Sequence, residues 1–187
     1  EDLFPEYGMD LYPGDKINTT DSVAEIRLDP NGSLIKLATN TNFVIDTLQN
    51  RGGAEANTFS LVKGKLKAVA ARSGSDKYQI QTQTAVCGVR GTTFALKVEE
   101  GLSDAAFVQK GLVTFQKIAT GESLELGAGM FADTFAAAFE ALPAPEDVIS
   151  DFLAGIEEFV GENMNPDAVP GNEPVAEEPE EEGAVEE

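Results

Sequence analysis

The chain has 187 residues, of which 42% are hydrophobic, so it is long enough for one domain of ordinary size with its own core. It contains no histidine. This excludes Ser-His and Cys-His nucleophilic pairs and histidine-ligated metal centres. Chemistry that uses carboxylates, lysine or metal–oxygen ligation stays open, but the sequence contains no catalytic constellation, so we expect a non-enzymatic protein without catalytic residues, a cofactor or a metal centre.

The net charge of −20 is concentrated in the C-terminal part of the chain. Residues 1–117 hold fourteen acidic and all thirteen basic residues, whereas residues 118–187 hold nineteen acidic residues and no basic one. A nucleic-acid-binding protein needs a basic footprint, and anionic lipid also attracts basic segments. The charge thus argues against nucleic acid and anionic membrane surfaces as partners, and favours solubility and weak binding of cations or of a basic partner.

Cys87 is the single cysteine, so an internal disulfide is excluded. Its neighbours are apolar, which predicts a buried thiol of low reactivity. No apolar run approaches the roughly 18 residues that a transmembrane helix needs, so we expect no direct membrane span.

Residues 1–7 read as an N-terminal arm, and a Pro-Gly turn at Pro13-Gly14 follows one short strand. Alternating apolar and polar residues then predict about ten short strands within a β domain of residues 8–129. The predicted strands cover 22–28, 33–38, 42–48, 58–62, 65–70, 78–83, 92–99, 105–109, 112–117 and 123–126. This spacing is typical of an all-β sandwich, barrel or solenoid.

Short turns join several of these strands. Asp29-Pro-Asn-Gly32 predicts a hairpin between 22–28 and 33–38, and Lys110-Gly111 predicts another between 105–109 and 112–117. Similar units around Gly32, Gly64 and Gly111 suggest repeated corners. They have no strict period, so both sandwich and solenoid stay open.

The composition changes after Gly129, and two amphipathic helices are predicted over residues 130–163. The first, 130–142, is alanine-rich, and Phe131, Phe135, Ala138, Phe139 and Leu142 would share one face. The second follows Pro145, and its apolar face would be Val148, Ile149, Phe152, Leu153, Ile156, Phe159 and Val160. This face could pack on the β domain or form an interaction helix for a partner.

Residues 164–187 have the composition of a disordered acidic tail, with four prolines and nine acids between Asn165 and Glu187. Such a tail could serve solubility alone. Alternatively, it could bind divalent cations weakly or contact a basic partner.

The most distinctive run is Thr82–Phe94, T-Q-T-A-V-C-G-V-R-G-T-T-F, which lies between two predicted strands. Its small and β-branched residues favour a buried link over an exposed turn. Buried backbone groups need protein partners, and Arg90, with five donors, is a suitable supplier. We interpret the run as structural, with a recognition surface as the alternative.

This run resembles the signature of the FecR domain, an extracytoplasmic β-rich module. The matching residues are Thr84, Ala85, Val86, Gly88, Val89, Arg90, Gly91, Thr92 and Phe94. Gln83 replaces a frequent proline and Cys87 a frequent alanine. The opening motif Leu11-x-x-Gly14-Asp15-x-Ile17-x-Thr19 and weaker pieces extend the resemblance, in the family's order, over about residues 8–132.

The resemblance implies an extracytoplasmic location: periplasm, cell surface or secreted. FecR-type regulators join this domain to a cytoplasmic anti-sigma segment and a membrane helix, and this sequence contains neither. We therefore expect an exported binding or structural module that works through protein contacts. The alternatives are a cell-surface signalling regulator of the anti-sigma type, and a self-assembling surface or filament subunit that exchanges its arm or helices.

Overall fold

The computed structural model describes residues 6–29, 32–49, 56–71, 78–89 and 91–156. The strands of this part are β1 (Lys16–Asn18), β2 (Ala24–Leu28), β3 (Ser33–Leu37), β4 (Asn42–Thr47), β5 (Asn57–Val69), β6 (Tyr78–Gln81), β7 (Ala85–Val89), β8 (Thr93–Glu99), β9 (Ser103–Lys110), β10 (Leu112–Lys117), β11 (Ser123–Gly127), β12 (Met130–Asp133) and β13 (Leu142–Pro143). One helix, α1 (Glu146–Leu153), follows them. The predicted mainly β class is confirmed.

The strands form two sheets that share the long strand β5. Sheet A has the order β1-β4-β5-β6-β7-β10-β11, and sheet B has the order β2-β3-β5-β8-β9-β12-β13. Asn57–Lys63 of β5 pair within sheet A, whereas Gly64–Val69 pair within sheet B. All pairs are antiparallel except β5 with β6. The strand β5 therefore belongs to both sheets and joins the two layers.

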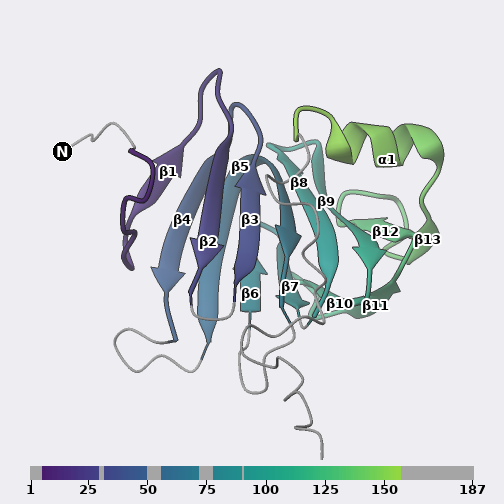
Figure 1. Ribbon diagram of the computed structural model, residues 1–187. Coiled ribbons are helices and arrows are strands. Elements are labelled where there is room, and N and C mark those ends of the chain that lie inside the picture. The colour runs from purple at the N-terminus through teal and green to yellow at the C-terminus, as the bar shows by residue number, and fades with distance from the viewer. Residues whose placement is uncertain (1–5, 30–31, 50–55, 72–77, 90, 157–187) are drawn as a thin grey trace, which may run out of the picture.

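Along each sheet the strands follow one another in chain order. Figure 1 shows the consequence, since β1 and β2 lie at one end of the molecule and β12, β13 and α1 at the other. The chain advances by passing repeatedly between the two sheets. The architecture combines the facing layers of a sandwich with the stepwise advance of a solenoid, the two possibilities that the sequence leaves open.

The core lies between the sheets. It takes alternate residues of each strand, as the period-2 patterns predict, and Phe43 of β4 stacks on Phe59 of β5 with ring centroids 5.5 Å apart. The largest fully buried side chains are Phe43, Phe59, Phe94, Phe115, Leu37, Ile45, Leu61, Leu66, Leu96, Leu126, Val108 and Val113. Every strand from β3 to β11 except β6 and β7 supplies one of them, and those two contribute Ile80 and Cys87.

Two predicted turns are wrong, because a glycine there takes the chain across the core. The strands predicted at 58–62 and 65–70 are one strand, β5, in which Gly64 (φ +99°) sits at the change of sheet. Gly111 (φ +92°) separates β9 in sheet B from β10 in sheet A, so these two strands do not form a hairpin. The predicted hairpin at Asp29–Gly32 is confirmed, since β2 pairs with β3.

The helix predicted over 130–142 is wrong, because residues 130–133 are the strand β12, which pairs with β9. Asp133 ends this strand: its Oδ1 accepts a hydrogen bond from the Phe135 amide at 2.8 Å. Phe139 then packs against Phe115, with ring centroids 5.9 Å apart. The β domain therefore continues past the predicted boundary at Gly129. Tertiary pairing overrides the helix propensity of the alanines.

The second predicted helix is present as α1, which begins after Pro145. It ends at Leu153, earlier than the predicted apolar pattern. Of that pattern, Phe152 and Ile156 are buried and Val148, Ile149 and Leu153 are half-buried. Phe159, Val160, the acidic tail and Arg90 lie outside the described residues.

Candidate functional site

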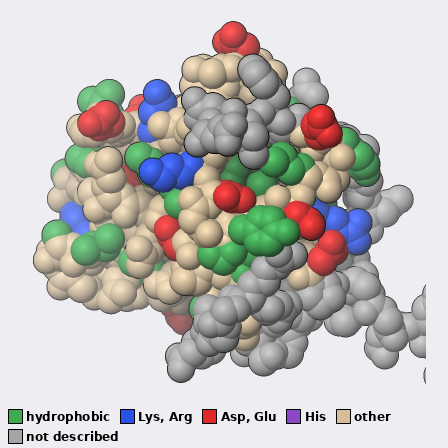
Figure 2. All heavy atoms as spheres, turned by 90° about the vertical axis from the view of Figure 1, so that its left-hand side faces the viewer, with side chains coloured by type: hydrophobic (Ala, Val, Ile, Leu, Met, Phe, Trp, Pro, Cys, Tyr) green, Lys and Arg blue, Asp and Glu red, His purple; other side chains and the backbone are tan. Residues whose placement is uncertain are grey.

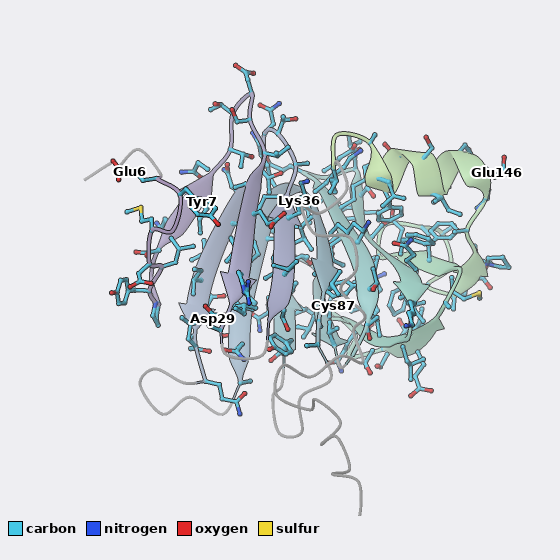
Figure 3. All side chains as sticks on the ribbon, in the orientation of Figure 1. Glu6, Tyr7, Asp29, Lys36, Cys87 and Glu146 are labelled. Atoms are coloured by element: carbon cyan, nitrogen blue, oxygen red, sulfur yellow. The ribbon has the colours of Figure 1, made fainter. Side chains whose placement is uncertain are left out.

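The signature run forms strand β7, in the middle of sheet A, and the segments on either side of it. Ala85, Cys87 and Val89 point into the core and are buried, while Val86 and Gly88 lie on the other face and are half-buried. After the turn, Thr92 and Phe94 are also buried. Figure 3 labels Cys87 in the interior of the domain. These positions give the signature a structural role at the centre of the fold.

Both threonines that open the signature bind one buried acid. Oδ2 of Asp104, on β9 in the opposite sheet, accepts hydrogen bonds from the hydroxyls of Thr82 and Thr84, each at 2.5 Å, and from the Thr84 amide at 3.1 Å. Asp104 is 2% exposed, and its Oδ1 is buried and accepts no hydrogen bond from the described part of the chain. The cluster ties the start of β7 to β9 across the core. No sequence pattern predicts this cluster, because Asp104 lies 20 residues beyond Thr84.

Cys87 is fully buried in the core, as predicted from its neighbours. Burial raises the pKa of its thiol well above the ordinary value, and the negative charge of Asp104 raises it further. A thiol that stays protonated is a poor nucleophile and a poor metal ligand. Cys87 is therefore a packing residue.

At the end of the signature the chain passes from β7 in sheet A to β8 in sheet B. Gly111, where the chain passes from β9 back to sheet A, lies next to this passage. The Thr92 hydroxyl donates to the Leu112 carbonyl oxygen at 2.9 Å. A Cβ on Gly111 would lie 2.9 Å from the carbonyl oxygen of Gly91 and 3.1 Å from the Cα of Thr92. The two passages between the sheets are thus in contact at Gly91 and Gly111. This close contact explains why residues without a side chain occupy both positions.

The motif at the start of the domain has a similar structural role. Asp15 Oδ2 accepts from the Tyr12 amide at 2.8 Å and closes the Pro-Gly turn. Thr19 donates to the Ala38 carbonyl oxygen at 2.6 Å and accepts from the Thr41 amide at 2.8 Å, so it secures the corner between β3 and β4. The family-like motifs therefore account for turns and crossings, and the surfaces remain available for function.

One of these surfaces, the outer face of sheet B, is covered by α1. Phe152 packs on Phe107 of β9, with ring centroids 5.8 Å apart, and is 2% exposed. Asp151 lies over two lysines of the sheet, with its Oδ1 2.9 Å from Lys65 Nζ and its Oδ2 2.6 Å from Lys97 Nζ. The apolar face proposed as an interaction helix is thus used, as far as α1 reaches, within this chain.

This ion pair should stabilise the domain in a pH-dependent manner. Hydrogen bonds from Lys97 and then Lys65 hold the pKa of Asp151 below its usual range. A depressed pKa in the folded state means that stabilisation is present above the unfolded pKa and is lost as the pH falls through the folded value. In urea unfolding, Asp151→Asn should cost about 0.5–1 kcal/mol at pH 7, and progressively less in acid, as the pH falls through the lowered pKa of Asp151. Asp29→Asn, at an exposed pair, is the control, and equal losses at pH 7 and in acid would contradict the assignment.

The end of the molecule that carries β1 and β2 is open. Within the described residues each of these strands pairs on one side only, β1 with β4 and β2 with β3. Large hydrophobic side chains are exposed on the arm before β1 and on the link to β2: Tyr7, Met9, Tyr12 and Val23. Figure 2 views this end and shows hydrophobic side chains at the surface with acidic ones beside them, and Figure 3 shows Tyr7 beside β1.

The outer edge of β1, with which no strand of the described residues pairs, presents backbone N–H and C=O groups. The Asp15 carbonyl oxygen accepts from the Ile45 amide at 3.0 Å, and the Thr19 amide donates to the Thr41 carbonyl oxygen at 2.9 Å. Because these bonds alternate along an antiparallel strand, Ile17 also faces β4, and the backbone of Lys16 and Asn18 faces outward. We call this edge, with the four exposed hydrophobic side chains, the open end. A sequence pattern could not identify it, since the arm has no periodicity.

Neither a cluster of metal-ligating side chains nor a membrane-spanning helix is found in the part of the chain that the structure describes. No group of three or more Cys, Asp or Glu residues there could hold a metal ion. No helix among these residues is long and apolar enough to cross a bilayer.

Comparison with known proteins identifies relatives of this architecture. The family model described as FecR protein matches residues 15–114. Two crystal structures of a candidate anti-sigma factor from Parabacteroides distasonis, at 1.65 Å and 2.50 Å, match with a TM-score of 0.62 and 16% identity. The match covers 75% of this chain and 65% of each of those chains, and at this identity it shows the shared fold alone. No curated protein sequence matches the chain.

Proposed function

Because the chain belongs to the FecR family, we propose that it is a non-enzymatic, extracytoplasmic module that binds a partner protein at its open end. The observation that carries the proposal is the edge of β1 with which no strand of the described residues pairs, beside exposed Tyr7, Met9 and Tyr12. An extended peptide can add to such an edge through main-chain hydrogen bonds, and aromatic side chains next to it supply contact area. The signature residues are buried and hold the fold that presents this edge.

The charge at the open end indicates the kind of partner. Residues 6–23 include Glu6, Asp10, Asp15 and Asp21, but Lys16 is their single basic residue. These acids should attract a partner segment with basic side chains and repel an acidic one. We expect the partner to supply an extended segment in which apolar residues alternate with neutral or basic ones.

Selection of peptides from a random 12-residue display library tests this mode of binding. Selected peptides should bind wild type and Asn18→Val alike, because both keep the outward amide of residue 18. Asn18→Pro should weaken binding about tenfold, since it removes one main-chain hydrogen bond. Proline is tolerated on an edge strand where its nitrogen faces outward, so the variant should remain folded.

The controls separate this mode from non-specific adhesion. Replacing Tyr7 and Tyr12 with serine should also weaken binding, whereas Leu102→Ser, at an exposed residue between β8 and β9, should not. Peptides that bind the proline variant as well as wild type would contradict strand addition at β1. A wild-type chain that dimerises through β1 would favour self-assembly instead, which sedimentation velocity detects.

A signalling role is the second candidate, because the fold resembles that of the candidate anti-sigma factor. In that case, the partner at the open end would be a signalling domain. To pass a signal across the membrane, this domain would have to be part of a membrane-anchored protein or bind to one. Co-purification from a membrane fraction, compared between wild type and Asn18→Pro, distinguishes this role from a purely structural one.

A further inference from the structure

The outer face of sheet B carries a second hydrophobic cluster, which α1 covers. Its buried members are Ala95 on β8, Ala105 and Phe107 on β9, and Phe152 on α1. Ala95 lies directly opposite Phe107, so β8 and β9 together form the floor of the contact. Because two of the floor residues are alanines, the ring of Phe152 can approach the sheet closely and lie beside Phe107.

Two lysines of the sheet border this cluster and bind the C-terminal half of α1. Both pair with the carboxylate of Asp151, Lys97 also pairs with Glu99 at 2.9 Å, and Lys65 also donates to the Asp151 carbonyl oxygen. The last turn of α1 contains no basic residue of its own, so the sheet supplies the positive charge that is favoured near the C-terminal end of a helix. We call the lysines and the three floor residues the helix-binding face: Lys65, Lys97, Ala95, Ala105 and Phe107.

The sheet beneath α1 is complete without the helix. Strand β8 pairs with β5 on one side and with β9 on the other, and β9 also pairs with β12. In Figure 3, Glu146 marks the start of α1, and the helix runs from there toward β8 and β9. It has only 8 residues, and helices shorter than about 12–15 residues are marginal in water. We therefore expect α1 to be helical only while it is docked, and sheet B to stay folded when α1 leaves it.

We propose that the helix-binding face is a docking site for an amphipathic helix of a partner protein, and that α1 occupies it in the free chain as an autoinhibitory contact. The partner helix carries an aromatic residue directly after an acidic one near its C-terminal end, as α1 carries Asp151 and Phe152. The apolar floor accepts the ring, and the two lysines select the carboxylate and the direction of the helix. This site lies on other strands than the open end, so either one can fail without the other.

Hydrogen exchange of the full chain tests whether α1 opens by itself. The amides of Ile149 and Ala154 donate to the carbonyl oxygens of Pro145 and Ser150. Their protection factors should be roughly 100-fold lower than those of the β8 amides, because α1 opens without the sheet. Asp151→Lys should lower the helix values further and leave β8 unchanged. Equal protection in α1 and β8 would mean that the helix opens only with the whole domain, which would overturn the proposal.

A fluorescent peptide with the sequence of residues 144–156 tests the docking site, because it stands for a partner helix. It should bind the full-length Phe152→Ser variant roughly tenfold more tightly than the wild type, whose own α1 competes. Asp151→Lys keeps Phe152 and frees the face in a second way, should serine disturb the fold. Ile118→Ser, at an exposed residue after β10, is the control and should bind the peptide like the wild type.

Charge reversal identifies the contact. A peptide with Asp151→Lys should bind the Phe152→Ser chain roughly tenfold more weakly than the unchanged peptide, and Lys65→Glu in that chain should restore the binding. If the unchanged peptide bound the wild type and both opened variants equally, or bound neither opened variant, the proposal would be overturned. Wild-type dimers that Phe152→Ser abolishes, detected by sedimentation velocity, would also overturn it, since the occupant would then be α1 of a second copy.

Discussion

Asp104→Ala should lower the free energy of unfolding by roughly 3 kcal/mol, because it removes the acceptor of three hydrogen bonds in the core. The hydroxyls of Thr82 and Thr84 could turn to the Ala85 carbonyl oxygen at 3.2 Å and to Thr134 Oγ1 at 2.6 Å. For the Thr84 amide, no second acceptor is found among the described residues. A hydrogen bond to a charged group contributes about 1.5–3 kcal/mol, and an orphaned buried donor costs about 1–3 kcal/mol. Urea unfolding at pH 7 measures the loss.

Asp104→Asn is the matched control, since its side chain keeps one acceptor oxygen at the same place. We expect it to lose less than half as much stability as the alanine variant. If the two variants were equally unstable, the stabilisation would come from the charge of the carboxylate and not from the acceptor oxygen that Asp and Asn share. If alanine cost under about 1 kcal/mol, the cluster would not tie the signature strand to the opposite sheet.

Gly64→Ala should also destabilise the domain by roughly 3 kcal/mol. Its positive φ of +99° disfavours any residue with a Cβ, and such an atom would lie 2.6 Å from the Cα of Thr41. The conformational cost is about 1–2 kcal/mol, and forcing extra volume into a packed site costs about 1–3 kcal/mol more. Thermal unfolding should show a clearly lower midpoint.

Gly101→Ala separates the two contributions to this loss. Gly101 also has a positive φ, +69°, but a Cβ there would meet nothing within 4 Å. We expect this variant to lose only about 1 kcal/mol. Equal losses at the two glycines would show that the crossing of β5 between the sheets is not sterically tight.

Local patterns predicted the features that depend on local chemistry. Alternation in residues 22–28, followed by a Pro-Asn-Gly turn and a return strand at 33–38, predicted a hairpin that the structure contains as β2 and β3. Small apolar neighbours predicted the burial of Cys87. Both depend on side chains within a few residues of one another, and sequence reasoning detects such features well.

The crossings between sheets could not be predicted in this way. A glycine with positive φ serves a hairpin turn at Gly32 and a passage across the core at Gly64 or Gly111, and the sequence around each is alike. Which one forms depends on distant partners, such as Thr41 for Gly64.

The same limitation explains the error at residues 130–142. Their alanines favour a helix locally, but Phe131 pairs with Phe107 on β9, and Phe139 closes the core at Phe115. These long-range contacts outweigh local propensity. The open end was missed for a related reason, because exposed Tyr7 and Tyr12 become informative only when β1 is known to be an edge strand.

Hydrogen exchange of the full chain, with and without a selected peptide, tests the central claim most directly: the signature holds the fold and the edge of β1 binds the partner. The amides of Ala85–Val89 should exchange slowly in both states. Peptide binding should slow exchange at Lys16 and Asn18. Fast exchange in the signature strand, or protection there and not at β1, would contradict this account.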